Sequence, residues 1–157
     1  MDGNRRPVPI GTAEGVTYSS ANRSAAMPSN TPAQLVERYF DAILAHDDLA
    51  VRACLADSDF HYQSPIGTFT DADAFAQFVS MTGGILHDIE RRRCFADGDD
   101  VCHWLVFLTQ LSERISTPAV QWARVKHGRI VSIELLFDPY RYRRLFDVDD
   151  ATITDQG

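Results

Sequence analysis

The sequence predicts one α+β domain in which three helices cover one face of a curved, mostly antiparallel sheet. Three observations predict this fold class. The first half of the domain holds three segments with helical periodicity and capping residues, and the second half holds four segments with strand character separated by tight turns. The 157-residue chain is also 45% hydrophobic, which is enough for a single domain with a sizeable core.

The first helix is predicted to begin directly after Thr31. Thr31 can act as the N-cap, Pro32 suits the first helical position, and Gln34 completes a capping box. Apolar residues then recur at steps of three and four, at Leu35, Val36, Tyr39, Phe40, Ile43 and Leu44. One stripe of this helix is therefore expected to face the core.

Two more helices are predicted before the main strands. Asp47 or Asp48 can cap a short second helix. Thr70 and Asp73 can cap a third helix, which is expected to end at the glycine pair 83–84. The apolar residues that this third helix buries are Phe75, Phe78 and Val79.

The rest of the domain has the pattern of a meander of strands. A short extended segment over residues 60–63 comes first and ends at Pro65 and Gly67, because these residue types close strands and form turns. Longer strands are expected at residues 86–96, 101–111, 115–125 and 129–137, with turns at 97–100 and 126–128. Such closely spaced strands with short turns pair antiparallel with their neighbours.

The composition of the two ends sets the domain boundaries. Residues 1–30 are rich in Pro, Gly, Ser and Asn and show no sustained apolar period, so we expect a flexible N-terminal arm. The domain itself is expected over residues 31–140. Residues 141–157 change from arginines to aspartates, which is typical of a polar, solvated C-terminal tail.

The charge balance argues against several classes of partner. The chain has 15 Lys and Arg against 22 Asp and Glu, a net charge of −7, which opposes binding to nucleic acids and to anionic membranes. Its apolar stretches, such as residues 104–108, are far shorter than the roughly 20 residues of a membrane span. We expect a soluble, cytoplasmic protein without nucleic-acid or membrane partners.

No cofactor or metal site is predicted. The three cysteines form no CxxC pair, the histidines have no metal-ligand spacing, and the usual glycine-rich phosphate and dinucleotide motifs are missing. We expect the cysteines to be reduced packing residues. The run Arg91-Arg92-Arg93 alternates across the two faces of a polar strand, and we expect it at an exposed sheet edge.

The order of elements resembles that of the nuclear transport factor 2-like superfamily, and within it the SnoaL-like and ketosteroid isomerase-like small proteins. The resemblance rests on Arg38-Tyr39-Phe40, Ala56-Asp57, Ser64-Pro65-Ile66-Gly67, Gly128-Arg129-Ile130-Val131 and Leu136-Phe137-Asp138, and it covers about residues 31–140. It implies a cone-shaped fold in which the sheet curls around the helices and encloses an apolar pocket. It also implies pairing of two chains through the sheet in many members.

The resemblance also assigns chemical positions. In ketosteroid isomerases an Asp before Pro-x-Gly moves the proton, whereas this chain has Ser64, and a hydroxyl is a poor base at neutral pH. Tyr39 matches the tyrosine that polarises the carbonyl, and Gln121 falls at the position of the second donor. Two donors are thus expected without the isomerase's base.

His103 is a candidate for the missing proton-transfer group. It is the only side chain between Val101 and Leu108 that titrates near neutral pH, and strand alternation places it on one face with Phe107. On the concave face it can act as general acid or base, whereas on the convex face it belongs to a dimer interface. The residues expected to line an apolar substrate pocket are Tyr62, Ser64, Phe107, Ile133, Leu135 and Phe137.

These residues are compatible with two different functions. The first is a cofactor-independent enzyme of the isomerase, cyclase or dehydratase type, acting on a hydrophobic carbonyl compound through His103, Tyr39 and Gln121. The second is a non-catalytic module that binds a hydrophobic ligand or serves only for dimerisation, which Ser64 favours. The epoxide-hydrolase branch uses one Arg and two Asp on the inner strands, and this chain has apolar residues and Gln121 there. The apolar residues expected on the outer sheet face predict a homodimer, and they are Trp104, Val106, Leu108, Val120 and Trp122.

Overall fold

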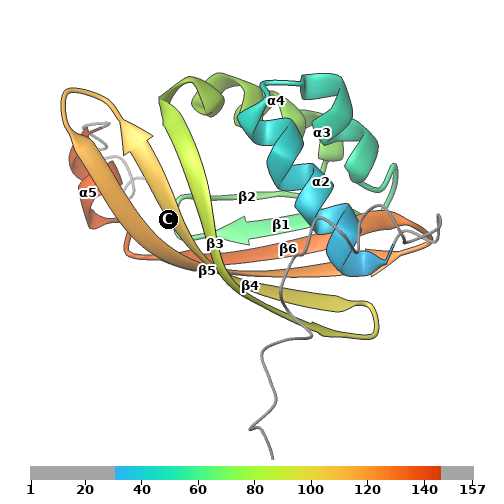
Figure 1. Cartoon of the computed structure of the whole chain (residues 1–157). Coiled ribbons are helices and arrows are strands. Elements are labelled where there is room, and N and C mark those ends of the chain that lie inside the picture. Colours follow the sequence, from blue (N-terminus) through green and yellow to red (C-terminus); the bar gives the residue numbers. More distant parts are fainter. Residues whose placement is uncertain (1–30, 146–157) are drawn as a thin grey trace, which may run out of the picture.

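Three helices lie against the concave face of a curved sheet (Figure 1) in the computed structural model, which describes residues 31–145. They are α2 (Pro32–Leu44), α3 (Asp48–Cys54) and α4 (Ala72–Thr82), and the short 3-10 helix η2 (Gly83–Ile85) follows α4. None of the helices in residues 31–145 is both long and apolar enough to span a membrane.

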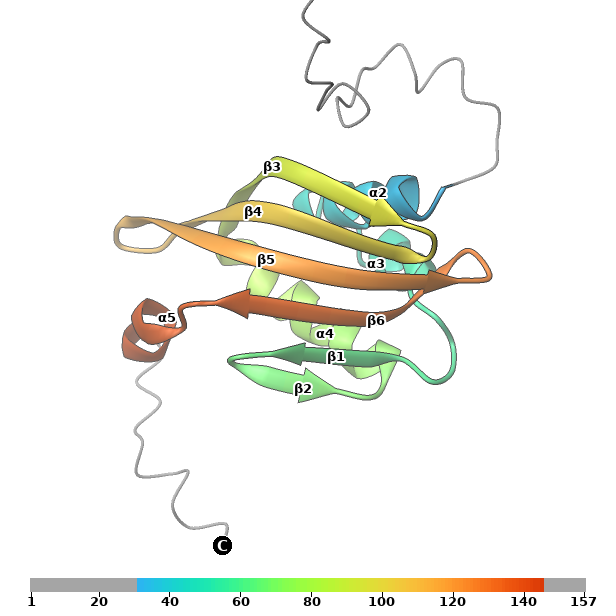
Figure 2. The ribbon, with the colours of Figure 1, turned by 90° about the horizontal axis from the view of Figure 1, so that it is seen from below.

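The sheet has six strands in the order β2-β1-β6-β5-β4-β3, as seen from its outer face in Figure 2. The strands are β1 (His61–Ser64), β2 (Gly67–Phe69), β3 (Leu86–Asp97), β4 (Asp100–Gln110), β5 (Arg114–Lys126) and β6 (Arg129–Phe137). All neighbours pair antiparallel except β1 and β6, which are parallel. The predicted α+β class, with a cone-like sheet around three helices, is confirmed.

Strand β5 shows how the sheet separates its two faces. Its residues alternate strictly between exposed and buried along its whole length. Ala119, Gln121 and Ala123 point toward the helices and are buried, whereas Val120 and Trp122 are exposed on the outer face. The alternation predicted from the sequence therefore places Gln121 on the concave side.

The predicted caps explain where α2 and α3 begin. Thr31 Oγ1 accepts a hydrogen bond from Gln34 N at 3.2 Å, and the Gln34 side chain accepts one from Thr31 N at 3.1 Å. Asp47, rather than Asp48, caps α3 by accepting from Ala50 N at 3.0 Å. All three bonds satisfy backbone donors that the start of a helix leaves unpaired.

Two local details differ from the sequence prediction. Asp71, not Thr70, is the N-cap of α4, and its carboxylate accepts from the backbone N–H groups of Asp73 and Ala74. Strand β2 was not predicted, and it forms a hairpin with β1 across the turn at Pro65 and Ile66. Three residues are too few to show an alternating pattern, which is why this strand leaves no signal in the sequence.

The chain does not become a solvated tail at residue 141 as predicted. Residues Tyr140–Leu145 form helix α5, which begins where Asp138 Oδ1 accepts a hydrogen bond from Tyr140 N at 3.0 Å. The Tyr142 side chain is only 9% exposed, and its ring packs edge-on against Phe137 with 5.5 Å between centroids. The expected arm, residues 1–30, and the remainder of the tail, residues 146–157, lie outside the described residues.

Candidate functional site

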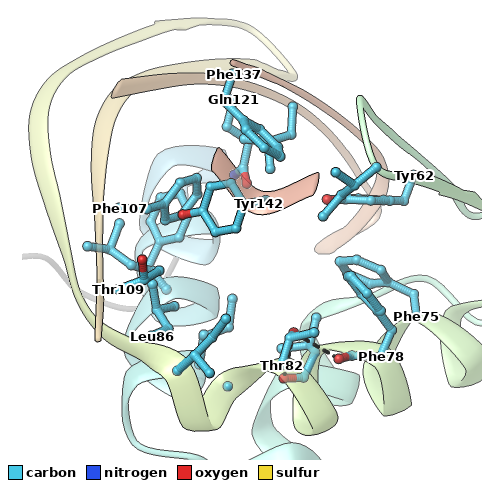
Figure 3. Close-up of a pocket in the computed structure, with 18 of the residues that line it drawn as sticks. Tyr62, Phe75, Phe78, Thr82, Leu86, Phe107, Thr109, Gln121, Phe137 and Tyr142 are labelled. Carbon is cyan, nitrogen blue, oxygen red and sulfur yellow. Dashed lines mark hydrogen bonds between the residues drawn. The ribbon is translucent and has the colours of Figure 1, made fainter. Parts of the chain in front are cut away.

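A cavity of about 150 Å³ lies between the concave face of the sheet and helices α2 and α4 (Figure 3). A single water needs about 10–15 Å³ of such space, so the cavity has room for a ligand of about ten non-hydrogen atoms. Its lining is Tyr39, Phe40, Ile43, Tyr62, Ile66, Phe75, Phe78, Val79, Thr82, Gly83, Ile85, Leu86, Ile89, Phe107, Thr109, Gln121, Leu135, Phe137 and Tyr142.

Most of the cavity wall is aromatic or aliphatic. Tyr62 stacks on Phe75 with 4.3 Å between ring centroids, and Phe75 contacts Phe78 in turn. Leu135 and Phe137 close the wall from strand β6. Walls of this kind bind apolar ligands through buried area and leave orientation to a few polar groups.

Gln121 supplies one of these polar groups. Its side chain is 3% exposed, and Figure 3 shows it directed into the cavity. Its Nε2 atom is buried and has no hydrogen-bond partner among residues 31–145. A buried donor without a partner costs about 1–3 kcal/mol, so this amide is available to an acceptor on a ligand.

Tyr39 supplies a second donor. It projects from α2, is 3% exposed, and its hydroxyl makes no hydrogen bond to the described part of the chain. Burial raises its pKa well above 10, and the nearby Tyr62 phenol acts in the same direction. The phenol therefore stays protonated and can donate a hydrogen bond at every physiological pH.

The two threonine hydroxyls of the wall are less free to bind a ligand. Thr82 donates to the carbonyl of Phe78 at 2.9 Å, and Thr109 donates to that of Ile115 at 3.5 Å. The hydroxyl of Tyr62 points into the cavity in Figure 3, and burial raises its pKa although the Ser64 hydroxyl opposes the shift. The donors of Tyr39 and Gln121, unlike those of the two threonines, have no hydrogen-bond partner among the described residues.

The structure brings together six of the side chains that the sequence assigned to the site. Tyr39, Tyr62, Phe107, Gln121, Leu135 and Phe137 all line this one cavity. They come from five different elements, α2, β1, β4, β5 and β6, so only the tertiary fold joins them. The two predicted donors face the same space as the predicted apolar wall.

Ser64 and Ile133 lie outside this lining, contrary to expectation. The Ser64 hydroxyl is held in the β1–β2 turn, where it donates to the carbonyl of Gly67 and accepts from Ile66 N, both at 3.3 Å. Ile133 is fully buried in the core beside its strand partner Tyr62. Ser64 thus has a turn-forming contact, and Ile133 a packing role.

His103 is also absent from the cavity lining, although it lies on the concave side of the sheet as predicted for a functional histidine. Helix α2 covers it completely: its exposed fraction is 0%, its Nε2 atom lies 2.9 Å from Glu37 Oε1, and its ring meets Phe40 edge-on. This placement does not bring the imidazole to a ligand in the cavity. Its assignment as the group that transfers a proton to substrate therefore lacks geometric support.

The partners of His103 determine its protonation. Burial alone lowers the pKa of His103, but its contacts with Cys94 and Glu37 outweigh burial and raise that pKa above 6.5. Burial raises the pKa of Glu37, and the opposing contacts with His103 and Arg91 leave it lowered overall. The two groups therefore favour the charged pair.

The prediction that all three arginines of the run 91–93 are exposed is wrong for Arg91. Arg92 and Arg93 are exposed on the edge strand β3, but Arg91 turns inward and forms ion pairs with Glu37 and Asp41 of helix α2. Alternation separates Arg91 from Arg92, as predicted, but does not reveal the acidic residues on the helix that covers the strand.

The lining contains no group that titrates near neutral pH in the described part of the chain. It has no carboxylate, imidazole, thiol or amine, and its ionisable members are tyrosines. Residues 31–145 also hold no cluster of His, Cys, Asp and Glu suited to a metal ion. The arrangement can therefore bind and polarise an oxygen atom, and it provides no strong base.

Several lining residues were not predicted as part of a site. The sequence identified Phe75, Phe78 and Val79 only as the apolar stripe of the third helix. An apolar period of this kind does not distinguish residues that pack in the core from residues that line a cavity. Tyr142 gave no signal, since it is one aromatic residue among arginines. Its contact with Phe137 depends on the turn at Asp138 and Pro139.

Comparison with solved structures shows the fold. An NTF2-like protein of unknown function from Cytophaga hutchinsonii matches with a TM-score of 0.64 and 20% identity over 77% of this chain and 99% of that chain. An LEH-like epoxide hydrolase from M. tuberculosis matches with a TM-score of 0.64 and 23% identity over 80% of this chain and 98% of that chain. A putative ketosteroid isomerase from Kribbella flavida matches with a TM-score of 0.59 and 18% identity over 68% of this chain and 77% of that chain.

Sequence comparison defines the family. No curated protein matches the chain. The sequence model of the SnoaL-like domain matches residues 36–133, which is well over half of the 157 residues and includes most of the elements that build the cavity. The fold is shared with an NTF2-like protein, and the match to the family model means that the chain belongs to the SnoaL-like domain family.

Proposed function

We propose that the protein binds a small, uncharged, hydrophobic molecule carrying an acceptor oxygen, such as a carbonyl compound. The observation that carries this proposal is the Gln121 amide, which is buried in an otherwise apolar cavity with its Nε2 donor unpartnered among the described residues. An acceptor oxygen on the ligand would satisfy that donor and the Tyr39 hydroxyl. The aromatic wall would bury the rest of the ligand.

The absence of charge from the cavity wall supports an uncharged ligand. The described residues of the lining include no side chain that is charged at neutral pH. A carboxylate or ammonium group would lose its hydration without gaining an ion pair, which is far more costly than the burial of a neutral polar group. A neutral acceptor is therefore the better match.

Catalysis of the isomerase, cyclase or dehydratase type is a second candidate, and the convergence of two donors on one cavity favours it. Donors aimed at a carbonyl oxygen also stabilise the negative charge that develops there in many reactions. The lining offers no base, so a proton acceptor would have to come from the substrate or from bound water. A protein named as a putative ketosteroid isomerase is among those that share this fold.

Native mass spectrometry of the freshly purified protein tests the proposed function. We expect a bound neutral compound of about ten non-hydrogen atoms, the size that the cavity accommodates, with at least one oxygen and little charge. Adding the recovered compound back separates the two candidates: a binding protein returns it unchanged, and an enzyme converts it. Recovery of only charged, strongly polar compounds would contradict the proposed function.

The outer face of the sheet supports a homodimer. Trp104, Val120, Trp122 and Leu136 are exposed there on adjacent strands, whereas Val106, which was expected in the same patch, is buried. Contiguous exposed apolar area of this kind is typical of interaction surfaces. We expect light scattering after gel filtration to give about twice 17.6 kDa. Changing Trp104 and Trp122 to Lys should give monomers, and an unchanged mass of 17.6 kDa in the parent protein would contradict the dimer.

A further inference from the structure

Four charged or chargeable side chains form a cluster behind the cavity, between helix α2 and strands β3 and β4. Glu37 Oε1 lies 2.9 Å from His103 Nε2, and the second oxygen of Glu37 binds Arg91. Arg91 also donates to Asp41 Oδ1 at 2.6 Å. The side chain of Glu37 is 7% exposed and that of His103 is 0% exposed, so half of this cluster is buried. The ligand site proposed above makes no use of these groups.

Phe40 links this cluster to the cavity. Its ring lies edge-on to the His103 ring, with 5.1 Å between centroids at an angle of 90°, and the guanidinium carbon of Arg91 lies 5.3 Å from its centroid. The same ring forms part of the cavity wall. Because Glu37 lies one turn before Phe40 on α2, its ion pairs and the ring share one face of the helix.

Gln121 is a second link. It is the direct partner of His103 across the β4–β5 pair, and both side chains point toward the helices. Directly opposite residues in an antiparallel pair have Cβ atoms about 4.5–5.5 Å apart. The imidazole therefore lies next to the side chain whose amide faces the ligand.

We propose that His103 is a positioning residue for the ligand site, and that its imidazolium form, held by Glu37, fixes Phe40 in the wall and lays positive charge behind Gln121. This inference rests on the proposed ligand function. A positive charge behind a donor strengthens its hydrogen bond to an acceptor oxygen. The affinity for such a ligand is then higher while His103 is protonated and lower once it is neutral.

The groups that face His103 define the expected direction of the pH effect. Helix α2 contributes Glu37, which contacts His103 directly, and Asp41, which pairs with Arg91. Strand β3 contributes Arg91 and Cys94. Strand β5 contributes Gln121, which is neutral. Contacts with Cys94 and Glu37 hold the pKa of His103 above 6.5 against the effect of burial. The affinity should therefore be constant in mildly acidic solution and fall as the pH rises through this raised value.

Acetophenone is a suitable probe, because it is a hydrophobic ketone of the right size that carries no charge at any pH used. Its Kd would be measured by NMR titration of the full chain from about pH 6 to about pH 9, a window that brackets a histidine with a raised pKa. We expect the affinity to fall about 5-fold across this window, the lower end of typical coupling between two sites. In His103→Gln, whose amide can still bind Glu37, the affinity should not change with pH.

His87→Gln is the matched control, since it makes the same substitution at an exposed histidine of strand β3 and should retain the pH dependence. A parent protein that binds acetophenone equally across the window, or a His103→Gln variant that keeps the full slope, would overturn this inference and leave the proposed function intact. Failure to bind at every pH would overturn both.

A second measurement needs no variant. If the protonated form binds acetophenone more tightly, acetophenone must in turn raise the pKa of His103, because the coupling is reciprocal. The pKa can be followed from the NMR signals of the His103 ring with and without saturating probe. A 5-fold change in affinity corresponds to a rise of about 0.7 in this pKa. An unchanged pKa would show that His103 has a structural role only.

Discussion

Replacing Glu37 by Ala is expected to lower the free energy of unfolding by about 3–5 kcal/mol, the usual cost of removing one partner from a buried ion pair. Glu37 bridges His103 on β4 and Arg91 on β3, and it is nearly inaccessible to solvent. The alanine variant leaves two positive groups under helix α2 with only the half-exposed Asp41 to compensate them. Urea unfolding followed by tryptophan fluorescence measures this loss.

Asp41→Ala is the matched control for this prediction. Asp41 lies on the same helix and pairs with the same arginine, but its side chain is 55% exposed. Exposed ion pairs contribute about 0–1 kcal/mol, so the loss should be much smaller than for Glu37. Equal losses for the two variants, or a loss below about 1 kcal/mol for Glu37→Ala, the range of an exposed pair, would contradict the assignment of a buried pair.

The effect of Glu37→Ala should also depend on pH in a defined way. The folded-state pKa of Glu37 is lowered from 4.5, so its contribution is present above that value and is lost as the pH falls through the folded-state pKa. The folded-state pKa of His103 is raised from 6.5, so its contribution is complete below 6.5 and is lost as the pH rises through the folded-state pKa. The difference between parent and variant should be largest between these limits.

Removing both donors from the cavity wall is expected to weaken the binding of a carbonyl ligand by about 5- to 150-fold. Each net hydrogen bond contributes about 0.5–1.5 kcal/mol, and the double variant Tyr39→Phe, Gln121→Leu removes two of them. Both replacements keep nearly the same side-chain volume, so the cavity should retain its shape. Gln121→Leu also removes a buried amide nitrogen that has no partner within residues 31–145, so the variant should fold at least as well as the parent.

Local rules in the sequence predicted most of the fold. Thr31 and Gln34 mark the start of α2 because a capping box involves only neighbouring residues. The alternation in β5 identified the face of Gln121, because successive side chains of a strand point to opposite sides. Family resemblance then supplied the curvature that makes the concave face a cavity.

What the sequence did not reveal depends on contacts between distant residues. His103 was correctly placed on the concave face, but 66 residues separate it from Glu37, which covers it. Alternation along a strand carries no information about which part of the helix lies above, and so a cavity position and a covered position look alike. Ile133 illustrates the same limit, since it shares the concave face with Leu135 and yet packs in the core.

The central claim, that Tyr39 and Gln121 orient a neutral ligand through its oxygen, can be tested with two probes of equal size. Acetophenone carries a carbonyl oxygen, and cumene has the same number of non-hydrogen atoms without an acceptor. Their dissociation constants would be measured by NMR titration of the parent protein and of the double variant Tyr39→Phe, Gln121→Leu.

We expect the parent to bind acetophenone with a higher affinity, relative to cumene, than the double variant does, by the roughly 5- to 150-fold that two hydrogen bonds provide. Cumene should bind the variant at least as well as the parent, because the wall stays apolar. An acetophenone affinity that is the same in parent and variant, with cumene bound by both, would contradict the role of Tyr39 and Gln121 as ligand donors.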